Sequence, residues 1–275
     1  MINEALGTYL IYNGQGELVE DNDFFENIKK ASLYEVVTVV DNVAIFFEEH
    51  MNRLQETAKM LDIELSVSTE ELEEGFYKLI SLNEIKESFI KLILFEDNYL
   101  IYEFWDRFPT SEDLENGIKT VIFDFERENP NAKILYTNFK AEVNKHLIQT
   151  DAFEAILRTE EGELLEGSRT NLYFTKGDKV ITAPDSRVLK GITRTRIEKI
   201  FKNEKIDVEK KIIKDIDLVD VDGAFITGTT VGVVPIKSIE SIELNSQENP
   251  LIQKIVQGYK NLQREYIKDK ESRDF

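Results

Sequence analysis

The segments EGSRTNLYF (residues 166–174) and LKGITR (residues 189–194) carry most of the information about the fold of this chain. In the second segment, a glycine and a threonine stand where apolar periodicity predicts that a helix begins, at Ile192. The first turn of a helix has N–H groups without partners inside the helix, and these favour an anion such as a phosphate. A glycine turn followed by an ordinary capping threonine is the alternative interpretation.

The composition restricts the class of protein. The chain has 275 residues, which suits one large domain or two smaller ones with a sizeable core. Lys and Arg number 34 and Asp and Glu 53, a net charge of −19 that disfavours nucleic acids and anionic membranes as partners. Cysteine is absent and only two histidines are present, so we expect no disulfide, no thiolate chemistry and no metal site. We expect a cytoplasmic protein that acts on small molecules, because no signal peptide or membrane-spanning run is visible.

Helix and strand patterns are mixed along the chain. A run of β-branched and aromatic residues around Asp41-Asn42 predicts a hairpin. Ser68 followed by Glu71 is typical of a capping box at a helix start. Further helices are expected from Ile192 to about Asn203 and over residues 250–269.

These patterns predict a mixed α/β protein with two subdomains. The polar segment 109–117, which begins at Pro109, is the expected linker. It would separate an N-terminal α/β subdomain, residues 1–108, from a C-terminal one, residues 118–275.

A few features of the sequence suit chemistry, although each also has a plainer explanation. A single lysine is usually solvated, a carboxylate after a strand is usually on the surface, and an arginine on an amphipathic helix usually extends its charge into water. The features are Lys140 at a helix start, Glu166 after a strand, Gly191-Ile192-Thr193, Gly228-Thr229-Thr230 and Arg53.

Together these segments resemble the class IV, or fold type IV, pyridoxal-phosphate-dependent aminotransferases. That family includes branched-chain aminotransferases, D-amino acid aminotransferases and aminodeoxychorismate lyase. The resemblance rests on EGSRTNLYF, on LKGITR, on GTT before VVPI, and on LYEVVTV and HMNRL in the first half. It runs from roughly Tyr9 to Tyr259. It implies a homodimer with the D-amino acid aminotransferase-like fold, pyridoxal 5′-phosphate (PLP) as cofactor, and a cofactor site in the cleft between the two subdomains.

The resemblance also implies roles for individual residues. Lys140 would form a Schiff base with the cofactor aldehyde and move a proton during catalysis, for which it must lose its own proton. Glu166 would pair with the pyridine nitrogen and keep it protonated. The phosphate would be held by Arg53, by the N–H groups of Ile192 and Thr193, by the Thr193 hydroxyl and by Thr229, with Gly191 letting the backbone approach closely.

The substrate side of the site departs from the family pattern. Tyr34 matches an aromatic residue that lines the substrate pocket in the D-amino acid enzymes, and Lys91 stands where the branched-chain enzymes have an arginine. Arg169 would either bind a substrate carboxylate or tie down its loop, and Thr230 is a further candidate for substrate contact. The usual Gly-Asp-Gly turn is replaced by ENIKKASLYE, and the D-amino acid enzymes' carboxylate-binding residues are missing.

The expected activity is transfer of an amino group between an amino acid and a 2-oxo acid, of the branched-chain or the D-amino acid type. The alternative is a lyase that releases pyruvate, as aminodeoxychorismate lyase does, and Lys91 keeps it open. A remoter alternative is a non-catalytic homologue that binds PLP or another phosphate.

Overall fold

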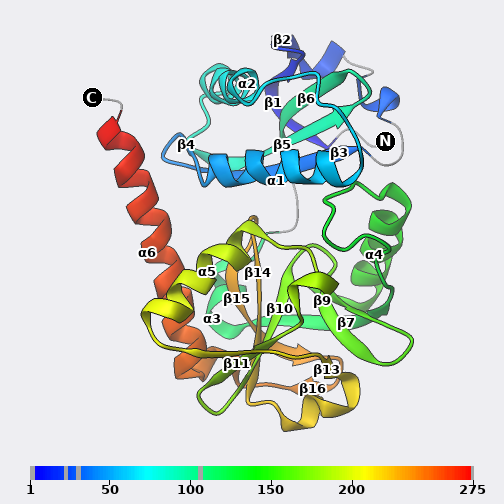
Figure 1. Ribbon diagram of the computed structural model, residues 1–275, viewed down its shortest axis with the longest axis vertical. Coiled ribbons are helices and arrows are strands. Elements are labelled where there is room, and N and C mark those ends of the chain that lie inside the picture. Colours follow the sequence, from blue (N-terminus) through cyan, green and yellow to red (C-terminus); the bar gives the residue numbers. More distant parts are fainter. Residues whose placement is uncertain (1–3, 22–23, 29–31, 105–107, 274–275) are drawn as a thin grey trace. The chain divides into compact units, whose positions relative to one another are not determined.

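The computed structural model describes residues 4–21, 24–28, 32–104 and 108–273. The chain folds as two compact units (Figure 1). Unit 1 comprises Met1–Asp106, Ala132–Thr137 and Gln263–Phe275, and unit 2 comprises Arg107–Asn131 and Asn138–Leu262. No helix of the described segments is long and apolar enough to cross a membrane.

Unit 1 is built on an antiparallel sheet with the strand order β2-β1-β6-β5-β3-β4. Helix α1 packs against β3, and α2 packs against β1 and β6. Their apolar faces meet one face of the sheet and form a core that includes Phe47, Phe76 and Ile90. The bounds are β1 Ala5–Tyr12, β2 Gln15–Leu18, η1 Val19–Asp21, η2 Phe24–Asn27, β3 Leu33–Val40, β4 Val43–Ala44, α1 Phe47–Met60, α2 Thr69–Leu82, β5 Glu87–Phe95 and β6 Asn98–Phe104.

One local prediction in unit 1 is confirmed and a second is confirmed in part. The turn between β3 and β4 is formed by Asp41 and Asn42, which both have left-handed φ values, 52° and 62°. The Ser68 side chain accepts a hydrogen bond from the Glu71 N–H at 3.1 Å and so caps α2. The Glu71 carboxylate accepts a hydrogen bond from the Tyr99 hydroxyl, at 2.9 Å, in place of the expected bond to the Ser68 backbone.

Two later segments join unit 1 through specific contacts, although the sequence analysis expected them in the second subdomain. Ile134 forms a β-bridge with Leu33, and the Leu135 N–H donates to the Ser32 carbonyl at 3.0 Å. Near the C-terminus, Tyr266 donates a hydrogen bond to Glu48. These pairings across long sequence distances decide where the two segments belong.

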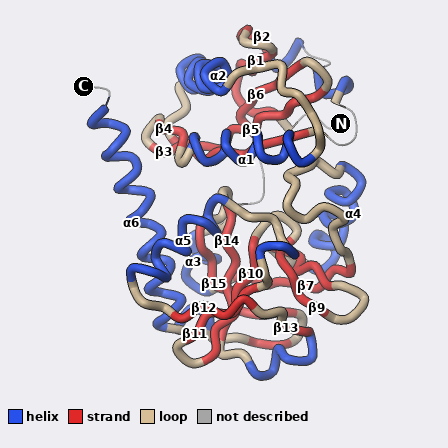
Figure 2. The backbone as a smooth tube through the Cα atoms, viewed as in Figure 1, coloured by secondary structure: helices blue, strands red, loops and turns tan. Residues whose placement is uncertain are grey.

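Unit 2 is built on a sheet with the strand order β12-β11-β10-β14-β15-β7-β8-β9-β13, and β16 pairs with β15. Figure 2 shows strands of this sheet in red and helix α5 in blue. An extra pairing between β9 and β10 closes the strands from β10 through β14, β15, β7 and β8 to β9 into a ring. Its bounds are β7 Ile118–Asp124, β8 Glu154–Arg158, β9 Glu163–Gly167, β10 Asn171–Lys176, β11 Lys179–Thr182, β12 Asp207–Lys210, β13 Ile213–Lys214, β14 Gly223–Gly228, β15 Gly232–Ile239 and β16 Ile242–Glu243.

The helices of unit 2 include the two that the sequence predicted. Helix α5 spans Ile192–Asn203 and α6 spans Pro250–Arg273, with its last residues in unit 1. The segment 109–117, expected as a linker, contains the short helix α3, Ser111–Asn116, capped by Thr110. The remaining helices are α4 Thr137–Thr150, η3 Asp185–Arg187, η4 Asp215–Asp220 and η5 Ser246–Glu248.

Candidate active site

Glu166 lies near the end of β9 and is almost completely buried. The Leu189 N–H donates to its Oε2 at 3.0 Å, and the Asn171 amide nitrogen is 3.4 Å from the same oxygen. Arg127 Nε lies 3.0 Å from Oε1. An ionised carboxylate only accepts hydrogen bonds. These contacts orient Glu166 as an acceptor for donors such as a protonated ring nitrogen.

The first turn of α5 has the properties expected of an anion site. The N-cap of the helix is Gly191, which has no side chain to accept from the first N–H groups. Thr193 is buried, and its Oγ1 lies 3.4 Å from the hydroxyl of Tyr259. Burial raises the pKa of Tyr259 to about 12, so this hydroxyl keeps its proton at neutral pH and can donate.

The structure gives a further reason for a glycine at position 191. Its φ of −64° and ψ of 148° are open to any residue. A Cβ at this position would lie only 2.3 Å from Oδ1 of Asn171. The glycine therefore makes room for the Asn171 side chain, whether or not the backbone also approaches a phosphate.

Thr229 and Thr230 lie in the turn that connects β14 to β15, between the paired residues Gly228 and Gly232. A Cβ on Gly228 would meet Thr170 at 3.3 Å, so this turn adjoins the loop of residues 167–170. Helix α5 packs against β14. The hydroxyl turn, the loop after Glu166 and α5 thus belong to one packed part of unit 2.

Glu154, which the sequence analysis missed, organises that loop. It is fully buried in β8 and accepts hydrogen bonds from the Ser168 hydroxyl at 2.6 Å and the Thr170 hydroxyl at 2.9 Å. Arg169 Nε lies 3.8 Å from Glu154, and its guanidinium stacks over Phe153 at 5.1 Å. These contacts hold the loop in place, which is one of the two roles expected for Arg169. A charged residue inside the apolar run FEAIL was the available signal.

Arg53 lies on α1 in unit 1, where Glu35 orients it. Its Nε and Nη2 donate to the two Glu35 oxygens at 2.7 and 2.6 Å, and His50 Nδ1 lies 2.7 Å from Oε2. Burial alone would raise the pKa of Glu35, but the charge of Arg53 and the hydrogen bonds from His50 and Arg53 outweigh it and lower the pKa to about 2. Glu35 thus occupies one edge of the guanidinium, and the Nη1 edge remains for another acceptor.

Two lysine ammonium groups lie near the ring of Tyr34, on β3. Nζ of Lys133 is 4.4 Å from the centre of its ring, and Nζ of Lys91 is 5.7 Å from it. Lys91 is buried and paired with Glu4, so a substrate carboxylate would have to compete with that residue. Burial lowers the pKa of His50, and the Lys133 charge adds to this effect, which places Lys133 in the neighbourhood of the Glu35 cluster.

Lys140 lies in the first turn of α4 and is half-buried. The helix start is as predicted, but the preceding segment is irregular, because β7 ends at Asp124. Phe139, its neighbour, stacks on Phe125 at 4.2 Å, and the Arg127 guanidinium lies 5.5 Å from the Phe139 ring. Arg127 therefore contacts both Phe139, at the start of α4, and Glu166. Arg127 follows β7 in a polar stretch without a pattern that would have indicated it.

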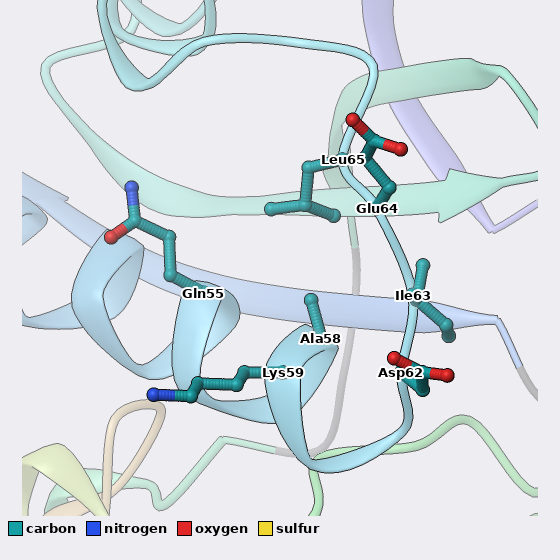
Figure 3. A pocket seen from close by; sticks show the side chains of 7 residues that line it. All are labelled: Gln55, Ala58, Lys59, Asp62, Ile63, Glu64 and Leu65. Carbon is teal, nitrogen blue, oxygen red and sulfur yellow. The ribbon is translucent and has the colours of Figure 1, made fainter.

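The predicted residues are divided between the units. Arg53, Tyr34 and Lys91 lie in unit 1, and the others lie in unit 2. A cavity of about 450 Å³ in unit 1 contains none of them (Figure 3). It is lined by Gln55, Ala58, Lys59, Asp62, Ile63, Glu64 and Leu65.

Comparisons with known sequences identify relatives of this chain. The family model described as Amino-transferase class IV matches residues 32–239. A probable branched-chain-amino-acid aminotransferase from Aquifex aeolicus is 30% identical over 245 residues, which cover 80% of this chain and 78% of the relative. A D-alanine aminotransferase from Bacillus licheniformis is 26% identical over 230 residues, covering 78% of this chain and 81% of the relative.

Solved structures share the fold. The Escherichia coli branched-chain amino acid aminotransferase superposes with a TM-score of 0.83 at 25% identity, covering 94% of this chain and 95% of that one. A putative 4-amino-4-deoxychorismate lyase from Legionella pneumophila has a TM-score of 0.72 at 20% identity, covering 82% and 89%, and shows similarity of fold alone. The predicted α/β aminotransferase fold is therefore confirmed, and the chain belongs to the class IV aminotransferase family.

Proposed function

We propose that this protein is a PLP-dependent aminotransferase that moves an amino group between an amino acid and a 2-oxo acid. Its membership of the class IV family supports an enzyme of this type. The observation that carries the proposal is Glu166, a buried carboxylate oriented by Leu189 and Arg127. When bound, PLP supplies an electron sink whose strength depends on a protonated ring nitrogen, and a carboxylate in contact with that nitrogen maintains the proton.

The residues fit the rest of the cofactor. The N-terminus of α5, with Gly191 as N-cap, would offer the N–H groups of Ile192 and Thr193 to a phosphate, and the buried Thr193 hydroxyl would add a donor. Thr229 would contribute a second hydroxyl. Arg53 would add a cation, through the guanidinium edge that Glu35 does not occupy.

A lysine would form the Schiff base with the cofactor and move the proton at the substrate α-carbon. The family resemblance assigned this role to Lys140. Lys133 is a second candidate, and one observation favours it. Its ammonium lies against Tyr34, the predicted substrate-pocket residue, and near the cluster that contains Arg53, the predicted phosphate ligand. A neighbouring cation favours loss of the proton from a catalytic lysine.

Reduction of the cofactor-loaded protein with borohydride, followed by peptide mapping, identifies the modified lysine directly. We expect the label on Lys133 or Lys140, and substitution of that residue by alanine should abolish both the label and turnover. Lys145→Ala is the matched control, because Lys145 is exposed on the same helix as Lys140. A phosphate-binding homologue without catalysis would carry no label and would lose nothing in either variant.

The visible spectrum tests the reaction type. A yellow protein that bleaches with one amino acid, and recovers with a 2-oxo acid, would establish transamination and the handedness of the substrate. Release of pyruvate from aminodeoxychorismate, without response to amino acids, would instead support the lyase. A colourless protein that takes up no PLP would contradict both activities.

The substrate contacts and the assembly remain part of the proposal. Tyr34, Lys91, Arg169 and Thr230 would contact the substrate, although Glu4 and Glu154 already lie beside the two cations. We propose a cytoplasmic homodimer, as the family resemblance implies. Sedimentation of the purified protein would report the dimer, and a monomer with full activity would contradict it.

A further inference from the structure

We infer that Asn171 is a positioning residue that couples Glu166 to the start of α5. It sets the separation between the carboxylate that would take the ring nitrogen of PLP and the N–H groups that would take its phosphate. The inference rests on the proposed function, because these two ends of the site are defined by that cofactor.

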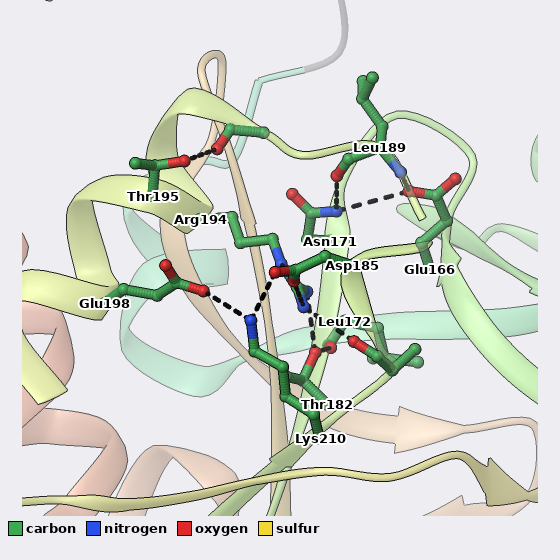
Figure 4. A network of polar contacts seen from close by, with 12 residues as sticks. Glu166, Asn171, Leu172, Thr182, Asp185, Leu189, Arg194, Thr195, Glu198 and Lys210 are labelled. Atoms are coloured by element: carbon green, nitrogen blue, oxygen red, sulfur yellow. Dashed lines mark hydrogen bonds and ion pairs between the residues drawn. The ribbon is translucent and has the colours of Figure 1, made fainter. Parts of the chain in front are cut away.

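Asn171 contacts both Glu166 and Leu189, and these two residues also contact each other (Figure 4). Asn171 on β10 stands directly opposite Glu166 on β9. Its Nδ2 donates to the Leu189 carbonyl at 2.7 Å and is 3.4 Å from Glu166 Oε2. The Leu189 N–H donates to the same Glu166 oxygen at 3.0 Å. One buried amide therefore joins the carboxylate to the segment that leads into α5.

The other end of the Asn171 side chain touches the N-cap of α5. Its Oδ1 occupies the space that a Cβ on Gly191 would need, 2.3 Å from the position of that atom. The backbone angles of Gly191 suit any residue, so in unit 2 it is this contact, and not the backbone conformation, that favours glycine. The amide is thus wedged between Glu166 and the residue that precedes the first helical N–H groups.

A second set of contacts, made by Arg194, also holds α5. Arg194 is fully buried, and its Nη1 donates to the Thr182 hydroxyl at 3.0 Å. That hydroxyl donates in turn to the carbonyl of Leu172 at 2.8 Å. Strand β10 therefore holds the helix start through the side chain of Asn171 and the backbone of the next residue. A rigid spacing favours a ligand that spans both ends, because less ordering is needed when it binds.

The first experiment compares PLP, which would span the site, with inorganic phosphate, which would fill only its phosphate end. Dissociation constants for PLP and for inorganic phosphate are measured on the full-length wild type and on Asn171→Ala. We expect PLP affinity to fall about tenfold, the scale of one lost hydrogen bond to a charged group, with phosphate affinity within about twofold. Unchanged PLP affinity would overturn the inference, as would an equal loss for both ligands.

Asn249→Ala is the matched control. The Asn249 amide donates to the Thr175 hydroxyl at 3.1 Å, near the other end of β10. Its loss should lower stability without changing the ratio of the PLP and phosphate affinities. If Asn171→Ala does not fold, Asn171→Ser provides a smaller polar replacement for the same comparison.

The second experiment tests the contact between Asn171 and Gly191 without using the cofactor. Gly191→Ala alone should lower the melting temperature, because its methyl group meets Oδ1 of Asn171. In the Asn171→Ala background, which lacks that oxygen, the same change should lower the melting temperature only slightly. Simple additivity of the two losses would show that Asn171 and Gly191 are not coupled, and would overturn the geometry proposed here.

The outcomes separate this inference from the proposed function. A wild type that takes up no PLP would sink the proposed function and, with it, the role of Asn171 toward the cofactor. A wild type that binds PLP tightly, with variants that bind it equally well, would remove the inference alone.

Discussion

Arg53 binds both carboxylate oxygens of Glu35, through Nε at 2.7 Å and Nη2 at 2.6 Å, and both side chains are buried in unit 1. His50 contacts the same carboxylate at 2.7 Å. A buried pair of this kind contributes little relative to an apolar pair, but removing one partner leaves a charge without compensation. The cluster is therefore sensitive to single substitutions, and it orients the arginine predicted to bind the cofactor phosphate.

Substituting Glu35 by glutamine should destabilise the protein. The change leaves the Arg53 charge buried without its partner, a situation that costs about 3–5 kcal/mol, with the lower end expected because glutamine keeps one acceptor. Urea denaturation gives the free energy of unfolding. Glu56→Gln, at an exposed position on α1, is the control and should change it by less than about 0.5 kcal/mol. Equal effects of the two changes would contradict the buried pairing.

The same carboxyl predicts a pH dependence. Its pKa is about 2 in the folded protein, against an ordinary value of 4.5. Because the folded pKa is the lower one, its contribution to stability is complete above about pH 4.5 and is lost as the pH falls toward 2. The stability difference between wild type and Glu35→Gln should shrink by about 3 kcal/mol over that window. A difference that stays constant from pH 5 to 2 would show that Glu35 does not titrate there.

Glu166→Gln should reduce kcat by roughly a hundredfold, the scale on which a preorganised electrostatic partner acts in catalysis. The amide cannot hold a protonated ring nitrogen as a carboxylate does, so the loss should appear in kcat more than in KM. Steady-state kinetics measure both. Glu163→Gln on the same strand, whose carboxylate binds Arg187 at 2.9 Å, should leave kcat within about twofold. Similar kcat values for wild type and Glu166→Gln would remove Glu166 from the cofactor site.

Replacing Arg194 by methionine should destabilise unit 2. The guanidinium is 1% exposed, donates to the Ala183 carbonyl at 2.8 Å and pairs with Asp185 at 2.8 Å (Figure 4). Its loss leaves several acceptors without a donor, at a cost of about 3 kcal/mol. Lys202→Met, an exposed position in the last turn of the same helix, is the control for a lost positive charge. Chemical denaturation gives the free energy of unfolding. A value for both variants equally close to that of wild type would refute the anchoring role.

Local physics made part of this structure predictable from the sequence. The hairpin at Asp41-Asn42 follows from residues that tolerate a left-handed backbone. The start of α5 at Ile192 follows from apolar spacing and from a glycine before it. The motifs EGSRTN and LKGITR also sufficed to indicate the family and a role for Glu166, because their residues lie close together along the chain.

The tertiary structure alone decided which distant groups meet. Arg53 and Glu35 are 18 residues apart, and no local pattern shows that one would orient the other. Arg127 contacts Glu166 although nothing around it in the sequence suggested a site residue. Residues 132–137, which carry Lys133 toward Tyr34, belong to unit 1 because of a bridge from Ile134 to Leu33. Periodicity and turn chemistry act over a few residues, whereas burial, strand register and pairing of charges depend on how remote segments pack. For the same reason the glycine at position 191 was visible in the sequence, but its need to accommodate Asn171 was not.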